Sequence, residues 1–82
     1  MAASDHQVTL ITRVGCHLCQ AAEERIAALS AELGFAADFV DVDSDRVLAN
    51  EYSDRVPVIL VDGAEHGYWQ VEEDRLRARL AR

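Results

Sequence analysis

The chain contains no lysine, a single proline, two cysteines and few aromatic residues. Without lysine, the chain cannot form a lysine Schiff base or supply the lysine of a phosphate-binding P-loop. Two cysteines are too few for the disulfide framework of a small secreted domain. The sequence also lacks an apolar run of the roughly 20 residues that cross a membrane, and its first residues do not read as a signal peptide. We therefore expect a cytoplasmic protein, in which a cysteine pair is more often chemical than structural.

Acidic side chains dominate the charge of the 82-residue chain, with 15 acidic residues against 8 basic ones and a net charge of -7. Nucleic acid and anionic membranes would be repelled by this charge, so we expect neither as a partner. The length suits one domain and a monomer. We expect a flexible N-terminus at residues 1–7 and a single domain at residues 8–82.

Hydrophobic periodicity predicts elements in the order β-α-β-α-β-β-α. We expect strands at 8–12, 39–42, 58–61 and 65–69, and helices at 17–33, 44–52 and from about 72 onward. Gly34 is expected to end the first helix and Ser44 to cap the second. The apolar face of the first helix is expected to consist of Leu18, Ala22, Ile26, Leu29 and Leu33. The fold class is α/β, because a right-handed β-α-β crossover followed by a hairpin gives one four-stranded mixed sheet with helices on both faces.

Cys16-His17-Leu18-Cys19 lies where the first strand leads into the first helix. Free backbone N–H groups and the positive end of the helix dipole favour a thiolate over a thiol at such a position. We predict that Cys16, at the N-cap, is the nucleophile of a dithiol that reduces or exchanges disulfides. Cys19 lies one turn further on, in line with the apolar face, and is predicted to be the shielded, resolving cysteine of the same redox disulfide.

A Cys-x-x-Cys sequence can also provide half of a zinc site. Such a site would need both His6 and His66, since the chain has no third cysteine. Asp41, Asp43 and Asp45 lack the spacing of a calcium loop and are better explained as charges at a strand end and a helix start. We expect no metal site.

The chain resembles small bacterial glutaredoxin-like proteins of the thioredoxin superfamily over nearly all of residues 8–82. The resemblance is carried by Thr12-Arg13-Val14-Gly15-Cys16-His17-Leu18-Cys19, Asp41-Val42-Asp43 and Arg55-Val56-Pro57-Val58-Ile59-Leu60. It implies a thioredoxin-like, glutaredoxin-type fold with a cis peptide bond between Val56 and Pro57, facing the cysteines. It also implies that Val56 and Pro57 bind substrate, with the Val56 backbone pairing to an extended segment.

Arg13 lies three residues before Cys16, where glutaredoxins often carry a lysine that binds a carboxylate of glutathione. The resemblance thus implies that Arg13 binds substrate, and its charge would also favour the Cys16 thiolate. The alternative is a surface arginine neutralised by nearby acids. His17 is expected to be an exposed spacer.

The segment after the last strand departs from the family pattern. Glutaredoxins that use glutathione usually have two glycines there, followed by a small polar residue and an aspartate. This chain has Gly67-Tyr68-Trp69-Gln70-Val71-Glu72-Glu73-Asp74. Arg55, in place of the family's threonine before Val56-Pro57, would compensate in part. We expect the rings of Tyr68 and Trp69 to pack under the terminal helix rather than to line the cleft.

The predicted function is that of a thiol–disulfide oxidoreductase that acts on a disulfide-containing protein or a small thiol and requires no cofactor. Its reductant stays open between glutathione, another low-molecular-weight thiol and a protein reductase. Two other functions also stay open. One is an iron–sulfur protein in which Cys16 and external thiols hold a cluster between two subunits, and the other is a redox-inert adaptor with the same fold.

Overall fold

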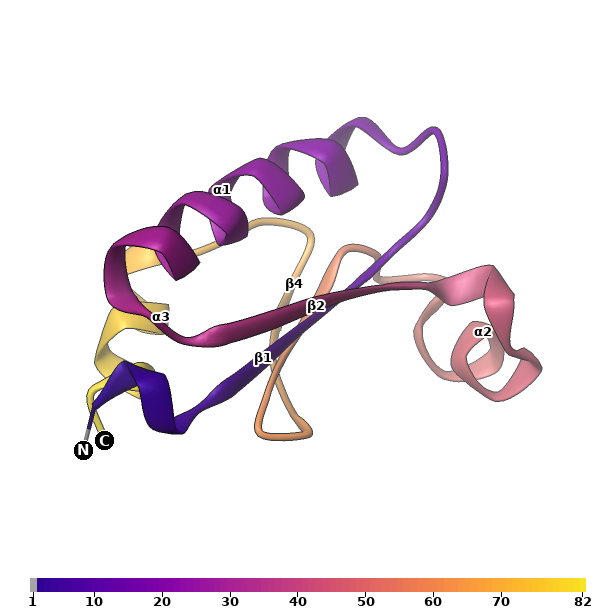
Figure 1. The fold of residues 1–82 in the computed structure, drawn as a ribbon. Coiled ribbons are helices and arrows are strands. Elements are labelled where there is room, and N and C mark those ends of the chain that lie inside the picture. The colour runs from indigo at the N-terminus through magenta and orange to yellow at the C-terminus, as the bar shows by residue number, and fades with distance from the viewer. Residues whose placement is uncertain (1) are drawn as a thin grey trace.

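A four-stranded mixed sheet runs through the centre of the described chain (Figure 1). Its strand order is β2-β1-β3-β4. The computed structural model describes residues 2–82, and Met1, part of the expected flexible N-terminus, lies outside the described residues. The strands are β1 (Gln7–Thr12), β2 (Ala36–Asp41), β3 (Val58–Val61) and β4 (Ala64–Tyr68). β1 is parallel to β2, whereas β3 is antiparallel to both β1 and β4. The predicted mixed sheet and its crossover are therefore confirmed.

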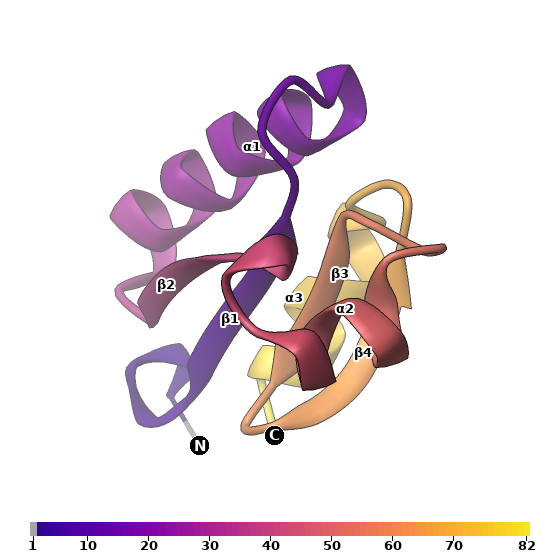
Figure 2. The same ribbon diagram turned by 90° about the vertical axis from the view of Figure 1, so that its right-hand side faces the viewer.

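Within residues 2–82, three α-helices and two short 3-10 helices accompany the sheet. They are η1 (Ala3–Asp5), α1 (His17–Leu33), η2 (Val42–Ser44), α2 (Arg46–Tyr52) and α3 (Glu73–Leu80). Figure 2 shows α2 in front of the sheet and α3 behind it. The helix α1 lies on the same face as α3, because buried residues of both helices belong to one cluster. Helices thus cover both faces, as the alternating pattern predicts.

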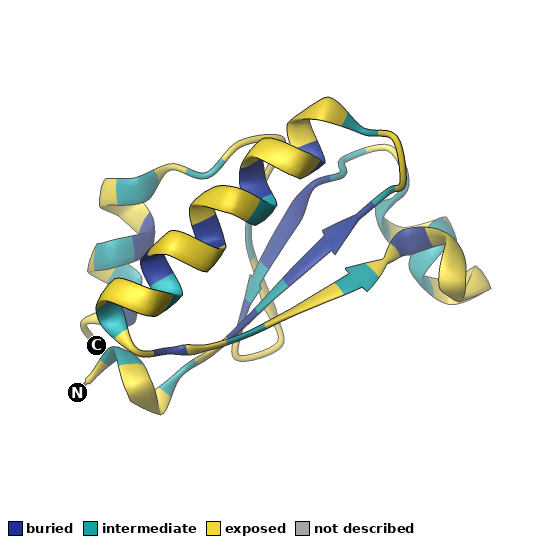
Figure 3. Ribbon diagram, turned by 45° about the horizontal axis from the view of Figure 1, so that its top comes forward, coloured by how far each residue is buried: buried dark blue, intermediate teal, exposed yellow. Residues whose placement is uncertain are grey.

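Buried side chains gather on both faces of the sheet, because successive residues of a strand point to opposite sides. The larger cluster lies under α1 and α3 and includes Leu10, Ile26 and Leu76. The smaller cluster lies under α2 and is formed by Ile11, Val42 and Val58, with Leu48, Tyr52, Val56 and Leu60 packed against it. Figure 3 shows buried residues recurring along the sheet-facing side of α1, while its outer side is exposed. This packing holds the start of α1 above the end of β1.

The helix caps follow the prediction at one helix and differ from it at another. Gly34 ends α1 with a φ of 85°, and its N–H donates to the Ser30 carbonyl. The helix α2 is capped by Asp45, whose carboxylate accepts the backbone N–H groups of residues 47 and 48. The prediction of Ser44 was wrong, because the Ser44 hydroxyl donates to the Asp41 carbonyl and closes the turn before the helix.

The boundaries of three strands differ from the prediction by one to three residues, whereas β3 matches the predicted range at both ends. Gln7 already pairs with Ala36, so both strands begin earlier than expected. The strand β2 ends at Asp41, and the buried Val42, expected within it, belongs to η2. The strand β4 ends at Tyr68, because Trp69 has a φ of 70°, which leaves the extended region.

His6 links the two ends of the described chain to the turn between β3 and β4. Its Nδ1 lies 2.6 Å from the Asp62 carboxylate, and its Nε2 lies 2.8 Å from the Arg82 carbonyl oxygen. The other Asp62 oxygen accepts the Gln7 N–H at 2.9 Å. These bonds to Asp62 and then to Arg82 raise the pKa of His6, because the protonated ring donates to both acceptors. Residues 3–7, expected to be flexible, contain η1 and the first residue of β1.

We expect stability to fall as the pH rises above the ordinary His6 pKa of 6.5 and through its raised value. The contribution of His6 is fully present below 6.5, while Asp62 stays ionised because the Gln7 N–H and then His6 lower its pKa. Thermal unfolding of the wild type and of His6→Gln, compared at about pH 5 and about pH 8, measures this dependence. The difference in Tm should be larger at the acidic pH. A difference that does not change with pH would contradict the assignment.

Candidate active site

Cys16 is the N-cap residue of α1, and Cys19 lies one turn inside the helix. The chain leaves β1 at Thr12 and turns at Gly15, whose φ is 80°. Glycine adopts this conformation without the penalty that a side chain would add, so the turn that leads to Cys16 depends on it. In Figure 1 this turn joins the end of β1 to the start of α1 at the upper right of the molecule. The cysteines therefore lie at one end of the sheet, on a short and well-defined connection.

The two sulfurs have different surroundings. Cys16 is half-buried, whereas Cys19 is 1 % exposed and belongs to the core. Cys16 Sγ accepts a hydrogen bond from the Cys19 backbone N–H, with an N···S distance of 3.1 Å. Both residues are free thiols in the structure. The site therefore combines an accessible sulfur, held over the helix N-terminus, with a covered sulfur one turn below.

Cys19 is held in its thiol form at neutral pH. Burial, followed by its hydrogen bond with Cys16, raises the pKa of Cys19 to about 11. The Arg13 backbone N–H, 3.4 Å from Cys19 Sγ, acts in the opposite direction. A donor is therefore already in place for the Cys19 sulfur when it loses its proton.

The Arg13 side chain turns toward an acid rather than standing free beside the cysteines. Its Nε and Nη2 donate to the two carboxylate oxygens of Asp43 at 3.0 and 3.1 Å, and its Nη1 donates to the Ser53 carbonyl at 3.4 Å. This pairing raises the pKa of Arg13 and lowers that of Asp43. The structure thus matches the alternative of a neutralised arginine, in which Arg13 ties the β1–α1 loop to η2 and the end of α2. Direct binding of a substrate carboxylate would compete with Asp43.

Val56 and Pro57 form the entry to β3. Their peptide bond is cis, and Pro57 is buried. The Pro57 carbonyl accepts the Trp69 N–H at 2.7 Å, which joins this loop to the end of β4. Within residues 2–82, neither the backbone N–H nor the C=O of Val56 has a hydrogen-bond partner. This backbone is therefore free to pair with another chain.

Arg55 fixes the loop before Val56 from two sides. Its guanidinium lies 5.6 Å from the centre of the Tyr52 ring. It also pairs with Glu65 of β4 at 3.4 Å and with Asp54 at 3.3 Å. Arg55 therefore links α2 to β4, and the sequence pattern did not indicate that role.

A groove of about 660 Å³ opens beside Leu18 and runs along the end of β4 to Arg75 of α3. Tyr68 and Trp69 line it, and their rings meet edge to face with centres 5.0 Å apart. They are 45 % and 54 % exposed, so the prediction that they pack under the terminal helix was wrong. The space under α3 is filled instead by Leu76 and Leu80.

Two further residues of this groove were missed from the sequence. Leu18 was expected on the buried face of α1 but is 56 % exposed. Its position inside the Cys-x-x-Cys sequence, at the first turn of the helix, is the signal that would have indicated an exposed role. Arg75 carried no comparable signal, since its contribution depends on how α3 lies beside β4.

The residues that a zinc site would need do not come together in the described chain. His6 is engaged with Asp62 and the Arg82 carbonyl. Among residues 2–82, no three His, Cys, Asp or Glu side chains are grouped as metal ligands. Over the same range, no helix combines the length and apolar character needed to cross a bilayer.

The sheet order, the helices on both faces and the cysteine pair at the start of α1 define a protein of thioredoxin-like fold. Fasciola hepatica thioredoxin superimposes with a TM-score of 0.69 at 24 % identity, covering 93 % of this chain and 78 % of that one. The chain belongs to the glutaredoxin-like domain family (DUF836), whose model matches residues 7–81. The predicted fold class and the predicted resemblance are therefore confirmed.

Relatives in bacteria share most of this chain. An uncharacterised protein of Mycobacterium tuberculosis (strain ATCC 25618 / H37Rv) is 49 % identical over 81 residues, covering 93 % of this chain and 84 % of that protein. A solution structure of a Nitrosomonas europaea protein gives a TM-score of 0.79 at 25 % identity, covering 90 % of this chain and 89 % of that one. A crystal structure of an X. campestris protein gives a TM-score of 0.72 at 36 % identity, covering 90 % of this chain and 95 % of that one. The glutaredoxin-like family, together with the Cys16 and Cys19 pair, favours a redox role.

Proposed function

We propose that the protein is a glutaredoxin-like dithiol–disulfide oxidoreductase that reduces or exchanges disulfides of proteins or low-molecular-weight thiols. The proposal is carried by the asymmetry of its cysteines. Cys16 offers an accessible sulfur at the N-cap of α1, whereas the buried Cys19 has a pKa raised to about 11. Such an arrangement separates the attacking sulfur from the one that resolves the intermediate. Membership of the glutaredoxin-like family supports the same chemistry.

In the first step the Cys16 thiolate attacks one sulfur of the substrate disulfide. A bond forms between Cys16 Sγ and that sulfur, the substrate S–S bond breaks, and the other sulfur leaves as a thiolate that takes up a proton. The Cys19 N–H at the start of α1 donates to Cys16 Sγ at 3.1 Å and holds the attacking sulfur in position for this step.

In the second step Cys19 loses its proton and attacks Cys16 Sγ. The mixed disulfide breaks, the second substrate sulfur leaves as a thiolate and takes up a proton, and Cys16 and Cys19 become a disulfide. Two electrons pass from the dithiol to the substrate, and the two thiol protons balance the two thiols released. The Arg13 N–H, 3.4 Å from Cys19 Sγ, stabilises the sulfur as it becomes an anion.

In this proposal, the substrate binds along the loop that precedes β3. The Val56 backbone has no hydrogen-bond partner in residues 2–82, so it can pair with an extended substrate segment over Pro57. Arg13 acts by fixing the β1–α1 loop through its ion pair with Asp43. The protein acts as a cytoplasmic monomer without a cofactor, and a small thiol or a protein reductase returns it to the dithiol.

A redox titration tests the proposal. Equilibrating the wild-type protein with thiol–disulfide buffers should show one reversible two-electron couple, at a potential of about -270 to -180 mV. Alkylation followed by mass spectrometry measures the oxidised fraction at each potential. Cys16→Ser and Cys19→Ser should each lose the couple. A wild-type protein that stays a dithiol across the whole range would contradict the proposed function.

A further inference from the structure

The helix α3 carries arginines on two sides, and the side that faces α1 is neutralised within the fold. Arg77 pairs with Glu32 of α1 at 2.7 Å and with Glu73 of its own helix at 2.9 Å. Glu73 in turn pairs with Arg25 of α1. These bonds attach α3 to α1 and leave no free charge on that side.

The other side of α3 carries Arg75 and Arg79, which lie four residues apart, and Arg82 follows two residues after the helix ends. Residues spaced in this way share one face of a helix. In the described range no carboxylate forms an ion pair with the side chains of Arg75 or Arg82, and Arg79 reaches only Asp62, at 3.6 Å. Positive charge is therefore left unpaired on this face of a protein whose net charge is -7.

This arginine face borders the groove that begins at the cysteine motif. The 660 Å³ groove beside Leu18 is lined by His66 and Arg75. A second hollow of about 320 Å³ is lined by the same two residues and extends to Arg79 and Arg82. One continuous surface thus leads from the cysteine-bearing turn of α1, past the exposed rings, to the unpaired arginines.

His66 marks the point that both hollows share. Its Nε2 is buried and has no hydrogen-bond partner in the described chain, which is rare for a buried polar atom. Burial, followed by the charges of Arg75 and Arg79, lowers the pKa of His66, so the ring is neutral and adds no charge. The Arg75 side chain lies against β4, since a Cβ built on Gly67 would make an ordinary van der Waals contact of 3.6 Å with Arg75 Nη1. The local positive charge is therefore that of the arginines.

We propose that this groove binds a carboxylate of the disulfide substrate, and that Arg75 is the residue that pairs with it. The proposal rests on the proposed oxidoreductase function and names its substrate class, disulfides with an acidic group near the reactive sulfur. The negative net charge of the protein repels an anion from most of the surface. An arginine without a carboxylate partner attracts the anion and can pair with it. Glu65 also lines the groove but is engaged by Arg55, which leaves Glu72 as the opposing charge.

The rings of Tyr68 and Trp69 would contact the part of the substrate that lies between its reactive sulfur and its carboxylate. They are exposed on the path from Leu18 to Arg75 and offer flat apolar surface. Trp69 is the sole tryptophan of the chain, so its fluorescence reports directly on occupancy of the groove.

A binding experiment without thiol chemistry tests the proposal. The full chain with Cys16→Ser and Cys19→Ser is titrated with a short peptide whose cysteine is blocked as a methyl disulfide and flanked by glutamates. A matched peptide carries glutamines instead. We expect the acidic peptide to bind about two- to fivefold more tightly, which is the size of the effect of an exposed ion pair. Adding Arg75→Gln should remove this difference.

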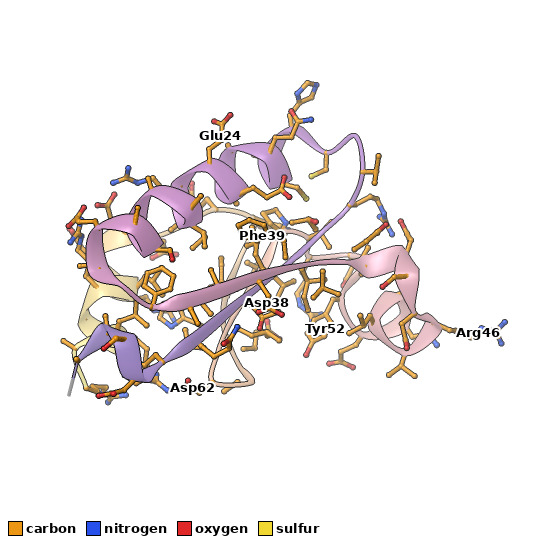
Figure 4. All side chains as sticks on the ribbon, in the orientation of Figure 1. Glu24, Asp38, Phe39, Arg46, Tyr52 and Asp62 are labelled. Carbon is orange, nitrogen blue, oxygen red and sulfur yellow. The ribbon has the colours of Figure 1, made fainter. Side chains whose placement is uncertain are left out.

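Arg46→Gln is the matched control, because it removes the same charge elsewhere. Arg46 is exposed, has no carboxylate partner in the described chain and points from α2 into solvent (Figure 4). It should leave the preference for the acidic peptide intact. Equal binding of the two peptides, or equal losses in Arg75→Gln and Arg46→Gln, would overturn the proposal.

Titration with cystine distinguishes the two sources of the carboxylate. Binding of cystine that is lost in Arg75→Gln assigns the site to small thiols, whereas binding of the peptide alone assigns it to an acidic side chain of a protein. The cysteine-free protein keeps this result separate from the redox couple. If the wild-type protein shows no redox couple but the cysteine-free protein still prefers the acidic peptide, the oxidoreductase function alone is refuted. If the wild-type protein shows the redox couple but the cysteine-free protein binds both peptides equally, the carboxylate site alone is refuted.

Discussion

Replacing Cys16 with serine is expected to abolish disulfide reduction, lowering kcat/KM by roughly a thousandfold or more, as loss of a nucleophile does. A serine hydroxyl at the N-cap stays protonated, so no anion is available to attack the substrate. Cys19 cannot take over, because it is 1 % exposed and its pKa is raised to about 11. Reduction of a chromogenic aromatic disulfide, followed by its thiolate absorbance, measures the effect.

Cys19→Ser provides the control, since it keeps the attacking sulfur. It should release one equivalent of thiol at a rate close to that of the wild type and then stop, because the mixed disulfide on Cys16 is not resolved. The two variants thus separate attack from resolution. Substantial turnover in Cys16→Ser, or loss of the first equivalent in Cys19→Ser, would reverse the assigned roles.

Ile26→Ala is expected to destabilise the fold by about 2–5 kcal/mol, which is typical of a large-to-small change in a core. Ile26 is 0 % exposed and packs in the cluster that joins α1 and α3 to the sheet. A domain of this size has a free energy of unfolding of only about 4–12 kcal/mol, so a large share would be lost. Because α1 carries both cysteines, activity should fall with the folded fraction on warming. Urea denaturation followed by circular dichroism measures the change.

Leu18→Ala, on the same helix, is the matched control for stability. Leu18 is 56 % exposed, so truncating it should change the free energy of unfolding by no more than about 0.5 kcal/mol. Equal effects of the two substitutions would contradict the packing of α1 described above.

The elements that could be predicted from the sequence are those whose local pattern agrees with their tertiary role. The helix α1 has a periodic apolar face, a cysteine at its N-cap and Gly34 at its end, and each of these signals acts within a few residues. The run Val58–Val61 is apolar throughout because β3 is covered on both faces. The same local signals correctly predicted that Cys16 lies at the N-cap of α1 and that Cys19 lies one turn inside the helix.

The features that could not be predicted depend on residues far apart in the chain. Arg13 pairs with Asp43, 30 residues away, and nothing near Arg13 indicates that partner. The rings at the end of β4 lie in the groove because the backbone turns at Trp69, with a φ of 70°. Arg75 matters only because α3 runs back beside β4. Each of these facts follows from the assembled fold rather than from a local pattern.

The central claim is that Cys16 attacks and Cys19 resolves, and one measurement tests it most directly. Cys19→Ser is mixed with a disulfide-bonded peptide, and the trapped product is mapped by mass spectrometry after proteolysis. The account predicts one peptide per protein molecule, joined through a disulfide to Cys16 and released by a reducing agent. Unmodified Cys16 after full exposure to the disulfide would contradict it.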